Sequence, residues 1–154
     1  MEIFTDGNLI ARILLTLVTA GYGVVTILAD INKTHATNPA WTPHARFHVV
    51  WQVSSYAGFG LLALALIWTP GPHAIARLYL VSMFAVIVYA AFFVALVTMK
   101  LYGGRTFDDN GHQPLTVRIA NRPRLLDLNV TVFSGFSAML VATMLLLSRA
   151  ALAG

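Results

Sequence analysis

The sequence predicts an all-α integral membrane protein, a single domain of residues 1–154 built as a four-helix bundle. The expected topology is up-down, with two long loops on one face. Only 10% of the residues are charged and 58% are hydrophobic, whereas soluble domains carry about 25% charged residues. Four apolar stretches are long enough to cross a bilayer, which takes about 20 helical residues. Lipid is therefore expected to cover most of the surface.

The four spans are expected at residues 9–29, 46–68, 74–99 and 125–147. We do not expect the first to be a cleavable signal peptide, because Glu2 and Asp6 precede it and its apolar run is too long. The second and third are joined by Thr69-Pro70-Gly71-Pro72, a tight turn, since proline and glycine interrupt helices. The connections at 30–45 and 100–124 are long, and their aromatic residues and prolines predict ordered loops.

Basic residues predict the orientation. Seven lie toward the long loops (Lys33, Arg46, Lys100, Arg105, Arg118, Arg122 and Arg124) and three toward the other side (Arg12, Arg77 and Arg149). Because cytoplasmic loops carry the excess of Lys and Arg, we expect the long loops in the cytoplasm, both termini on the opposite side, and a bacterial inner membrane as the location. These charges are not clustered with aromatic residues, which argues against nucleic acid as a partner. The absence of cysteine excludes disulfide and thiolate chemistry.

Polar side chains recur at helical spacing near the long-loop end of two spans. The stripes are Thr19, Gly23, Thr26 and Asp30 in the first span, and His44, His48, Gln52 and Ser55, with Trp51 beside them, in the second. Polar groups in a membrane span are costly and by default indicate function. The structural alternative is an interfacial layer whose side chains reach the lipid headgroups.

The connection after Asp30 is expected to hold His44 and His48 at a fixed height, because Pro43 suits the first turn of a helix. Asp30, Asn32 and His35 are then expected to face the second span as supporting partners. His112, in the other long connection, has no partner at a regular spacing and is expected to face solvent. Asp127 is interpreted as a charge that complements the start of the fourth helix.

Three kinds of chemistry are open to these residues. Two histidines four residues apart can bind one metal from a single helix face, so His44 and His48 with Asp30 or Asp127 would form a zinc site. A haem held by one histidine would leave an open iron position for a substrate. Acid–base catalysis by histidine and aspartate needs no cofactor.

A family resemblance bears on this choice. The segment Ala45-Arg46-Phe47-His48 is similar to the A-R-x-H segment of the membrane-bound styrene oxide isomerases, and the similarity continues in ARLYLVSMF, residues 76–84, and in GGRTF, Gly103 to Phe107. Those are small four-helix membrane proteins, and they bind ferric haem b through that histidine as trimers with haem near subunit contacts. The resemblance implies a trimeric haem-b isomerase, whose iron opens a small hydrophobic epoxide from the bilayer to a carbonyl compound.

The resemblance also implies roles for single residues. His48 is the expected axial ligand of the iron. Arg46, Trp51 and Arg105 are also expected at the haem, and so is His44, although His44 has no counterpart in the family segment and would contact a propionate, orient the loop or lie at the interface. The residues expected at the substrate are Gln52, Ser54 and Tyr89. The family has an asparagine where this chain has Ser54, so haem binding is better supported than epoxide isomerisation. The alternatives are a cofactor-free or metal-dependent isomerase or hydrolase acting on a lipid-like substrate, and a non-catalytic membrane subunit.

Overall fold

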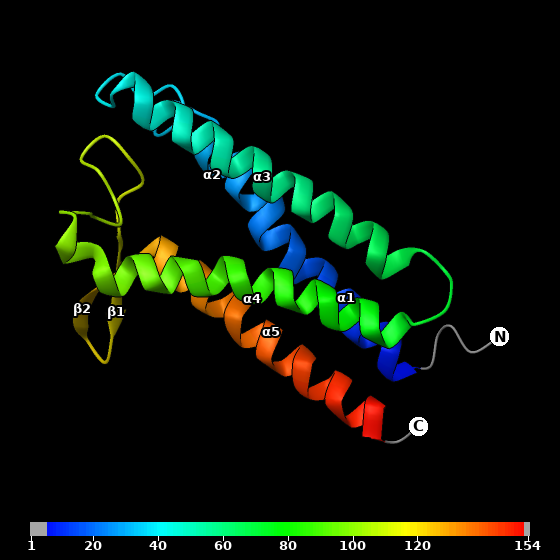
Figure 1. Ribbon diagram of the computed structural model, residues 1–154. Helices are drawn as coiled ribbons and strands as arrows, with labels where there is room; N and C mark the ends of the chain where they lie inside the picture. The colour runs from blue at the N-terminus through cyan, green and yellow to red at the C-terminus, as the bar shows by residue number, and fades with distance from the viewer. Residues whose placement is uncertain (1–5, 153–154) are drawn as a thin grey trace.

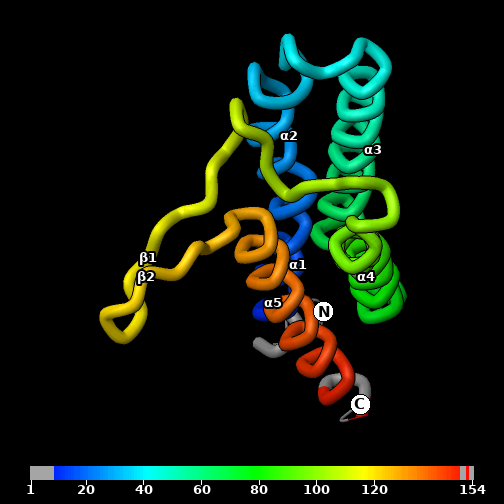
Figure 2. Tube along the Cα trace, turned by 90° about the vertical axis from the view of Figure 1, so that its left-hand side faces the viewer, coloured from blue at the N-terminus to red at the C-terminus, as the bar shows by residue number. Residues whose placement is uncertain are grey.

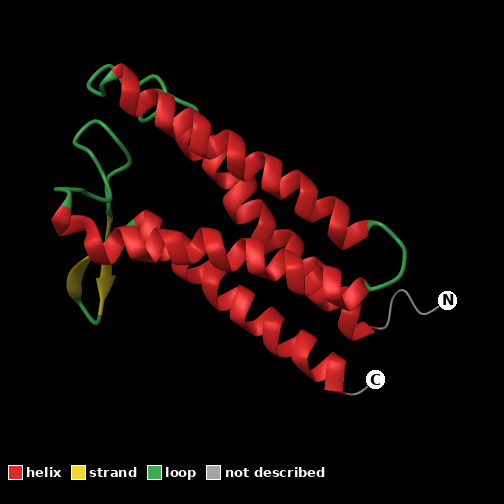
Figure 3. Ribbon diagram, in the orientation of Figure 1, coloured by secondary structure: helices red, strands yellow, loops and turns green. Residues whose placement is uncertain are grey.

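The computed structural model describes residues 6–152, most of them helical (Figure 1, Figure 3). The elements are α1 (Asp6–Gly23), α2 (Val25–Asp30), α3 (Pro43–Trp68), α4 (Ala74–Thr98), the 3₁₀ turn η1 (Met99–Leu101), β1 (Leu115–Ile119), β2 (Arg122–Leu126) and α5 (Leu128–Leu152). Helices α1 and α2 follow each other with a break at Val24 and together make the first apolar span.

Four apolar helical segments are long enough to cross a membrane, as the sequence predicts. They are Leu9–Asp30, Pro43–Trp68, Ala74–Leu101 and Leu128–Arg149. The second begins three residues before the predicted start at Arg46 because Thr42 caps it, its hydroxyl accepting a hydrogen bond from the Ala45 amide at 3.2 Å, with Pro43 in the first turn. Length and composition thus indicate a membrane protein.

The prediction of an all-α fold is wrong in one segment, because a two-stranded antiparallel sheet lies between α4 and α5. The pairing runs from Leu115 opposite Leu126 to Ile119 opposite Arg122. Ala120 and Asn121 form the two-residue turn, both with positive φ, 47° and 60°, as hairpins with a right-handed twist require. Since Leu125 belongs to β2, the last span starts three residues later than predicted.

Helix α1 is central, since it contacts each of α3, α4 and α5. Its side chains at a spacing of three or four residues are almost completely buried: Ala11, Leu15, Val18 and Tyr22. Figure 1 shows the short α3–α4 turn at one end of the helices and both long connections at the other end. Toward that second end, α2 and α3 diverge from α4 and α5 (Figure 1).

Glycines allow close approaches between the helices. A Cβ added to Gly23 on α1 would lie 3.4 Å from the Cα of Gly60 on α3, and the reverse holds for Gly60. A Cβ on Gly21 would lie 2.6 Å from the Tyr89 hydroxyl. Gly58 differs, because nothing lies within 4 Å of the position of its Cβ. Small residues at such crossings are how membrane helices pack.

We expect Gly60→Val to lower the free energy of unfolding by about 1–3 kcal/mol, because the added side chain must push α1 and α3 apart. Gly58→Val is the matched control, since it makes the same substitution on the same helix in open space. Unfolding of both variants in detergent by titration with SDS measures the difference. Equal stability of the two variants would contradict the proposed crossing.

Candidate functional site

A cavity of about 530 Å³ lies at the end of the helices where the two long connections meet. Its walls come from α2, α3, α4, α5 and both connections. The apolar part includes Val25, Phe92, Leu96, Met99 and Phe133. Phe92 and Phe133 stack on each other with ring centroids 4.1 Å apart. The size and the apolar lining are those of a small-molecule site.

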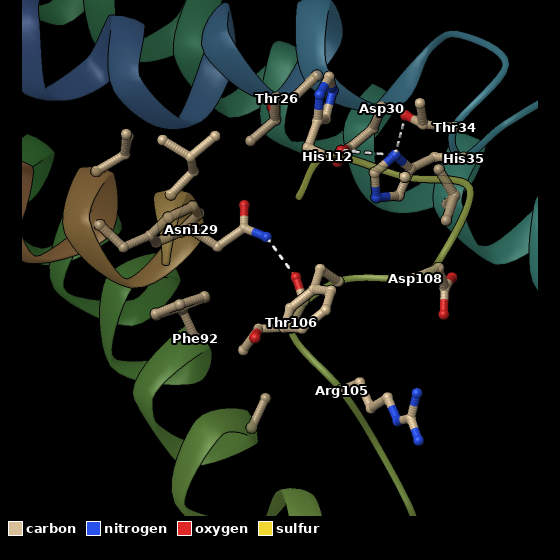
Figure 4. A pocket seen from close by; sticks show the side chains of 18 of the residues that line it. Thr26, Asp30, Thr34, His35, Phe92, Arg105, Thr106, Asp108, His112 and Asn129 are labelled. Atoms are coloured by element: carbon tan, nitrogen blue, oxygen red, sulfur yellow. Dashed lines mark hydrogen bonds and ion pairs between the residues drawn. The ribbon is translucent and has the colours of Figure 1, made fainter. Parts of the chain in front are cut away.

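Three ionisable side chains converge at the polar end of this cavity (Figure 4). Asp30 is the last residue of α2, and its Oδ1 lies 3.8 Å from His35 Nδ1. His112, an exposed residue of the second long connection, also lines the cavity, and its ring centroid is 6.4 Å from that of His35. Asp30 and His35 are only about one quarter exposed, at 25% and 27% of their side-chain surfaces. A carboxylate and two imidazoles in such a place can accept and donate protons.

Asn32 shapes the chain between Asp30 and His35. Its amide donates to the last carbonyls of α2, Leu28 O at 3.0 Å and Ala29 O at 2.8 Å. Its Oδ1 accepts from both the amide and the hydroxyl of Thr34, at 2.8 and 2.6 Å. The Thr34 hydroxyl is also 2.8 Å from His35 Nδ1, and the His35 ring packs edge-on against Trp41. Asn32 therefore ends the helix and orients the histidine, as asparagine side chains do in turns.

Two side-chain contacts join the long connections to each other. Asn38 is completely buried and pairs with Asn110 through two amide hydrogen bonds of 2.8 and 3.3 Å. The Trp41 indole N–H donates to Asp108 Oδ2 at 2.8 Å. Because His35 lies in one connection and His112 in the other, these contacts, here called the loop latch, hold the two histidines near each other.

Asp127 caps α5, in agreement with its interpretation as a helix-end charge. One carboxylate oxygen accepts from the Val130 amide at 3.0 Å and the other accepts from the Thr106 hydroxyl. Asn129 donates to the Thr106 carbonyl at 2.8 Å (Figure 4). Arg105 lines the cavity, but its side chain points away from Asp30 (Figure 4).

The predicted stripe on α3 is divided between two faces. Gln52 lines the cavity and donates to the Tyr56 hydroxyl at 3.2 Å. His44 and His48 are exposed and are not among the residues lining the cavity, and their Nε2 atoms are 3.0 Å apart. Phe47 and Trp51 beside them are each 61% exposed. The cavity and the histidine pair are thus separate features of one helix.

The other residues expected at the haem or the substrate lie as follows. Arg46 is half-buried in the first turn of α3, and Ser54 is exposed. Tyr89 is buried in the core, where its hydroxyl donates to the Val18 carbonyl at 2.7 Å. A bond from Tyr89 to a substrate oxygen stays a prediction, and it would require giving up that contact.

Among residues 6–152, no group of three or more histidine or acidic side chains is arranged to hold a metal ion. The zinc site envisaged from His44, His48 and an aspartate is therefore not assembled in the described part of the chain. Asp30 interacts with His35 and His112 instead, and Asp127 caps α5.

The sequence predicts Asp30 and His35 as supporting residues. The prediction that His112 faces solvent is confirmed, because the residue is exposed, but the sequence does not show that His112 also lines the cavity beside them. The partner of His112 is in another connection, so no spacing within its own segment could have identified it. The one signal was that two ordered loops were expected on the same face.

The model of a family of unknown function (DUF6640) matches residues 13–134 of the chain. No curated protein and no solved structure matches it. The matched range contains most of the first span, α3, α4, both long connections and the start of α5, and therefore the whole cavity lining.

We expect Asn38→Ala to loosen the loop latch, because it removes both amide hydrogen bonds to Asn110, at a cost of about 0.5–1.5 kcal/mol for each bond. Hydrogen exchange measured by mass spectrometry should speed up in residues 103–112 while the helices keep their protection. Lys33→Ala, an exposed position in the same connection as Asn38, is the control. Unchanged exchange at 103–112 in Asn38→Ala would show that the two connections do not depend on each other.

Proposed function

The chain belongs to a family of unknown function (DUF6640), and we propose that it is a membrane-embedded, cofactor-free isomerase that moves a proton within an apolar, lipid-like substrate. The observation that carries the proposal is the cluster of Asp30, His35 and His112 in the wall of a cavity whose other end is lined by apolar and aromatic side chains. Titratable side chains that lie close together in a cavity are a general sign of a catalytic site.

The reaction type follows from what the cluster offers. A proton-shift isomerisation needs one group that removes a proton from carbon and one that returns a proton to another carbon. Asp30 and His35 supply a carboxylate and an imidazole within 3.8 Å of each other, and the His112 ring lies 6.4 Å from that of His35 between centroids. No oxidant, reductant or second substrate is consumed, so the reaction balances within these groups and the substrate.

The substrate class follows from the polarity of the cavity. Its polar groups lie at the loop end, and the aromatic pair Phe92 and Phe133 contributes an apolar wall from α4 and α5. A molecule with one oxygen function and a hydrocarbon body would fit with its oxygen toward Asp30 and Gln52. That is the orientation of an amphiphile in a leaflet, and such a substrate partitions into the bilayer from which it would reach the site.

The membrane setting is part of the proposal. We place the four apolar helices across a bacterial inner membrane as an up-down bundle, with the cavity and both long connections at the cytoplasmic face. The supports are the apolar length of the helices and the excess of basic residues on the long-loop side.

We expect Asp30→Asn to lower turnover by a factor of about 100 or more, because removal of a general base costs about 10²–10⁴ in rate. The assay reconstitutes the protein in lipid nanodiscs in D₂O and supplies β,γ-unsaturated ketones of increasing chain length. Mass spectrometry then detects the isomer and the deuterium it has gained from solvent.

Asp109→Asn is the matched control, because Asp109 is an exposed aspartate of the second connection and is not among the residues lining the cavity. His35→Gln should lose turnover with Asp30→Asn, whereas Asp109→Asn should keep it. Isomerisation that survives Asp30→Asn would contradict this function.

A second candidate function is the haem-b epoxide isomerase that the resemblance to styrene oxide isomerases implies. The observation in its favour is the exposed imidazole of His48, which stacks on Trp51 with ring centroids 5.9 Å apart and is flanked by Phe47. One imidazole with aromatic neighbours fits the donor chemistry of a single axial ligand. A trimer that brought a second copy against this face of α3 would cover the haem.

Bound haem would supply a Lewis acid that polarises the oxygen of an epoxide. The residues of this chain would then have distinct tasks. His48 would ligate the iron. Arg46 is expected at the propionates, but it is two residues from His48 on α3, a spacing that places the two side chains on different sides of the helix. Arg105 is in the cavity wall, so its expected contact with the same haem lacks support from the geometry.

If haem binds, the protein purified in mild detergent should show a Soret band that shifts with dithionite, near one haem per chain. His48→Ala should abolish this band, whereas His44→Ala should keep it, because only one of the two is the expected ligand. Protein that stays colourless after haem supplementation would reject the haem candidate and leave the acid–base proposal untouched.

A further inference from the structure

The hairpin of β1 and β2 stands apart from the helices. Its strands pair with each other, and neither contacts a helix extensively. Figure 2 shows the hairpin extending sideways from the group of helices, beside the start of α5. An isolated two-stranded hairpin is marginally stable in water, so this one is expected to rest on a further surface.

The composition of the hairpin identifies the kind of surface. Residues 115–126 contain three arginines and no acidic or aromatic residue. Several apolar side chains are open, with Leu115 50%, Ile119 60% and Leu125 76% exposed. Cations beside exposed apolar groups suit the boundary of an anionic bilayer, where guanidinium groups meet phosphates and apolar groups leave water. The lack of aromatic residues removes the stacking platforms on which single-stranded nucleic acid binds.

The strand register separates two faces of the hairpin, because residues opposite each other share a face. Leu115, Val117 and Ile119 lie on one face together with Arg122, Arg124 and Leu126. Thr116, Arg118, Pro123 and Leu125 lie on the other. The first face thus presents a row of apolar side chains on β1 next to two arginines on β2.

The hairpin also lies at the end of the helices where a membrane surface would be. Its strands run across the direction of the helices rather than along it, near the end where α4 stops (Figure 1). That end carries the two long connections and most of the basic residues. With the helices across a bilayer, the hairpin would lie parallel to the membrane surface and beyond the area that the helices cover.

We propose that the hairpin docks on the bilayer surface beside the helices, with Leu115, Val117 and Ile119 in the interface and Arg122 and Arg124 on the phosphates of anionic lipids. The docking does not require the reaction proposed for the cavity. It makes the hairpin a lipid-sensing element of an otherwise helical membrane protein.

Because the chain has no cysteine, a single introduced cysteine can carry an environment-sensitive NBD label. In full-length protein reconstituted into vesicles of phosphatidylcholine and phosphatidylglycerol (7:3), we expect an NBD label at Ile119→Cys to emit at shorter wavelength and to be quenched by doxyl-labelled lipids. The same label at Thr116→Cys, on the opposite face, should report water. Labels that both report water, or both report lipid, would overturn the proposed face.

The arginines are tested by removing their charge while a polar side chain is kept. In the labelled Ile119→Cys protein, Arg122→Gln with Arg124→Gln should lower the ratio of docked to undocked hairpin about thirtyfold, about fivefold for each arginine near an anionic surface. Lys33→Gln with Lys100→Gln removes the same charge on the same side of the protein and should leave the ratio unchanged.

Phosphatidylcholine alone or high salt should reduce docking in the unaltered hairpin, because the attraction is screened. Docking that is equal in neutral and anionic vesicles would overturn the role of the arginines. A label that responds to added RNA and to neither vesicle would assign the hairpin to nucleic acid and reject the proposal.

Discussion

The contact between Gly23 on α1 and Gly60 on α3 sets the spacing on which the rest of the structure depends. The two backbones meet there so closely that a Cβ on either glycine would touch the Cα of the other. Helix α1 breaks at Val24, directly after the contact, and continues as α2. Thr26 and Asp30, about one and two turns further on, line the cavity. The helices therefore pack tightly up to this crossing and enclose open space beyond it.

Hydrogen bonding explains why the ionisable groups gather at that open end. In lipid every backbone polar group must be satisfied within the protein, which the helices achieve and irregular connections do not. The connections are held together by side chains instead: Asn38 bonds to Asn110, and Thr106 bonds to Asp127 at the start of α5. A carboxylate such as Asp30 can be kept at this depth only with partners, and the latched connections bring His35 and His112 to it.

The helices could be predicted from the sequence because length and apolar composition are enough to identify a span. The hairpin, the orientation of Tyr89 and the contact between the two long connections could not be predicted from hydropathy and residue spacing. The hairpin was not predicted, because Pro123 is unusual in a strand and because the turn of the hairpin is Ala120-Asn121 rather than the common Asn-Gly. Helix α4 is apolar on all sides, so its hydropathy does not say that Tyr89 turns into the core and bonds to Val18. His35 and His112 meet only because two connections fold together, and no spacing in the sequence records that contact.

The hairpin and the cavity are linked by the path of the chain. Only Gln113 and Pro114 separate His112 from β1, and Asp127, the cap of α5, directly follows β2. A hairpin held on a lipid surface would therefore restrain the residues on both sides of it. On one side is His112, which belongs to the ionisable cluster, and on the other side is Asp127. Lipid composition would in this way act on the position of His112 without any contact between lipid headgroups and the cavity. The histidine pair on the outer face of α3 has no such link, since His44 and His48 lie on a continuous helix whose position is set by the Gly23–Gly60 crossing.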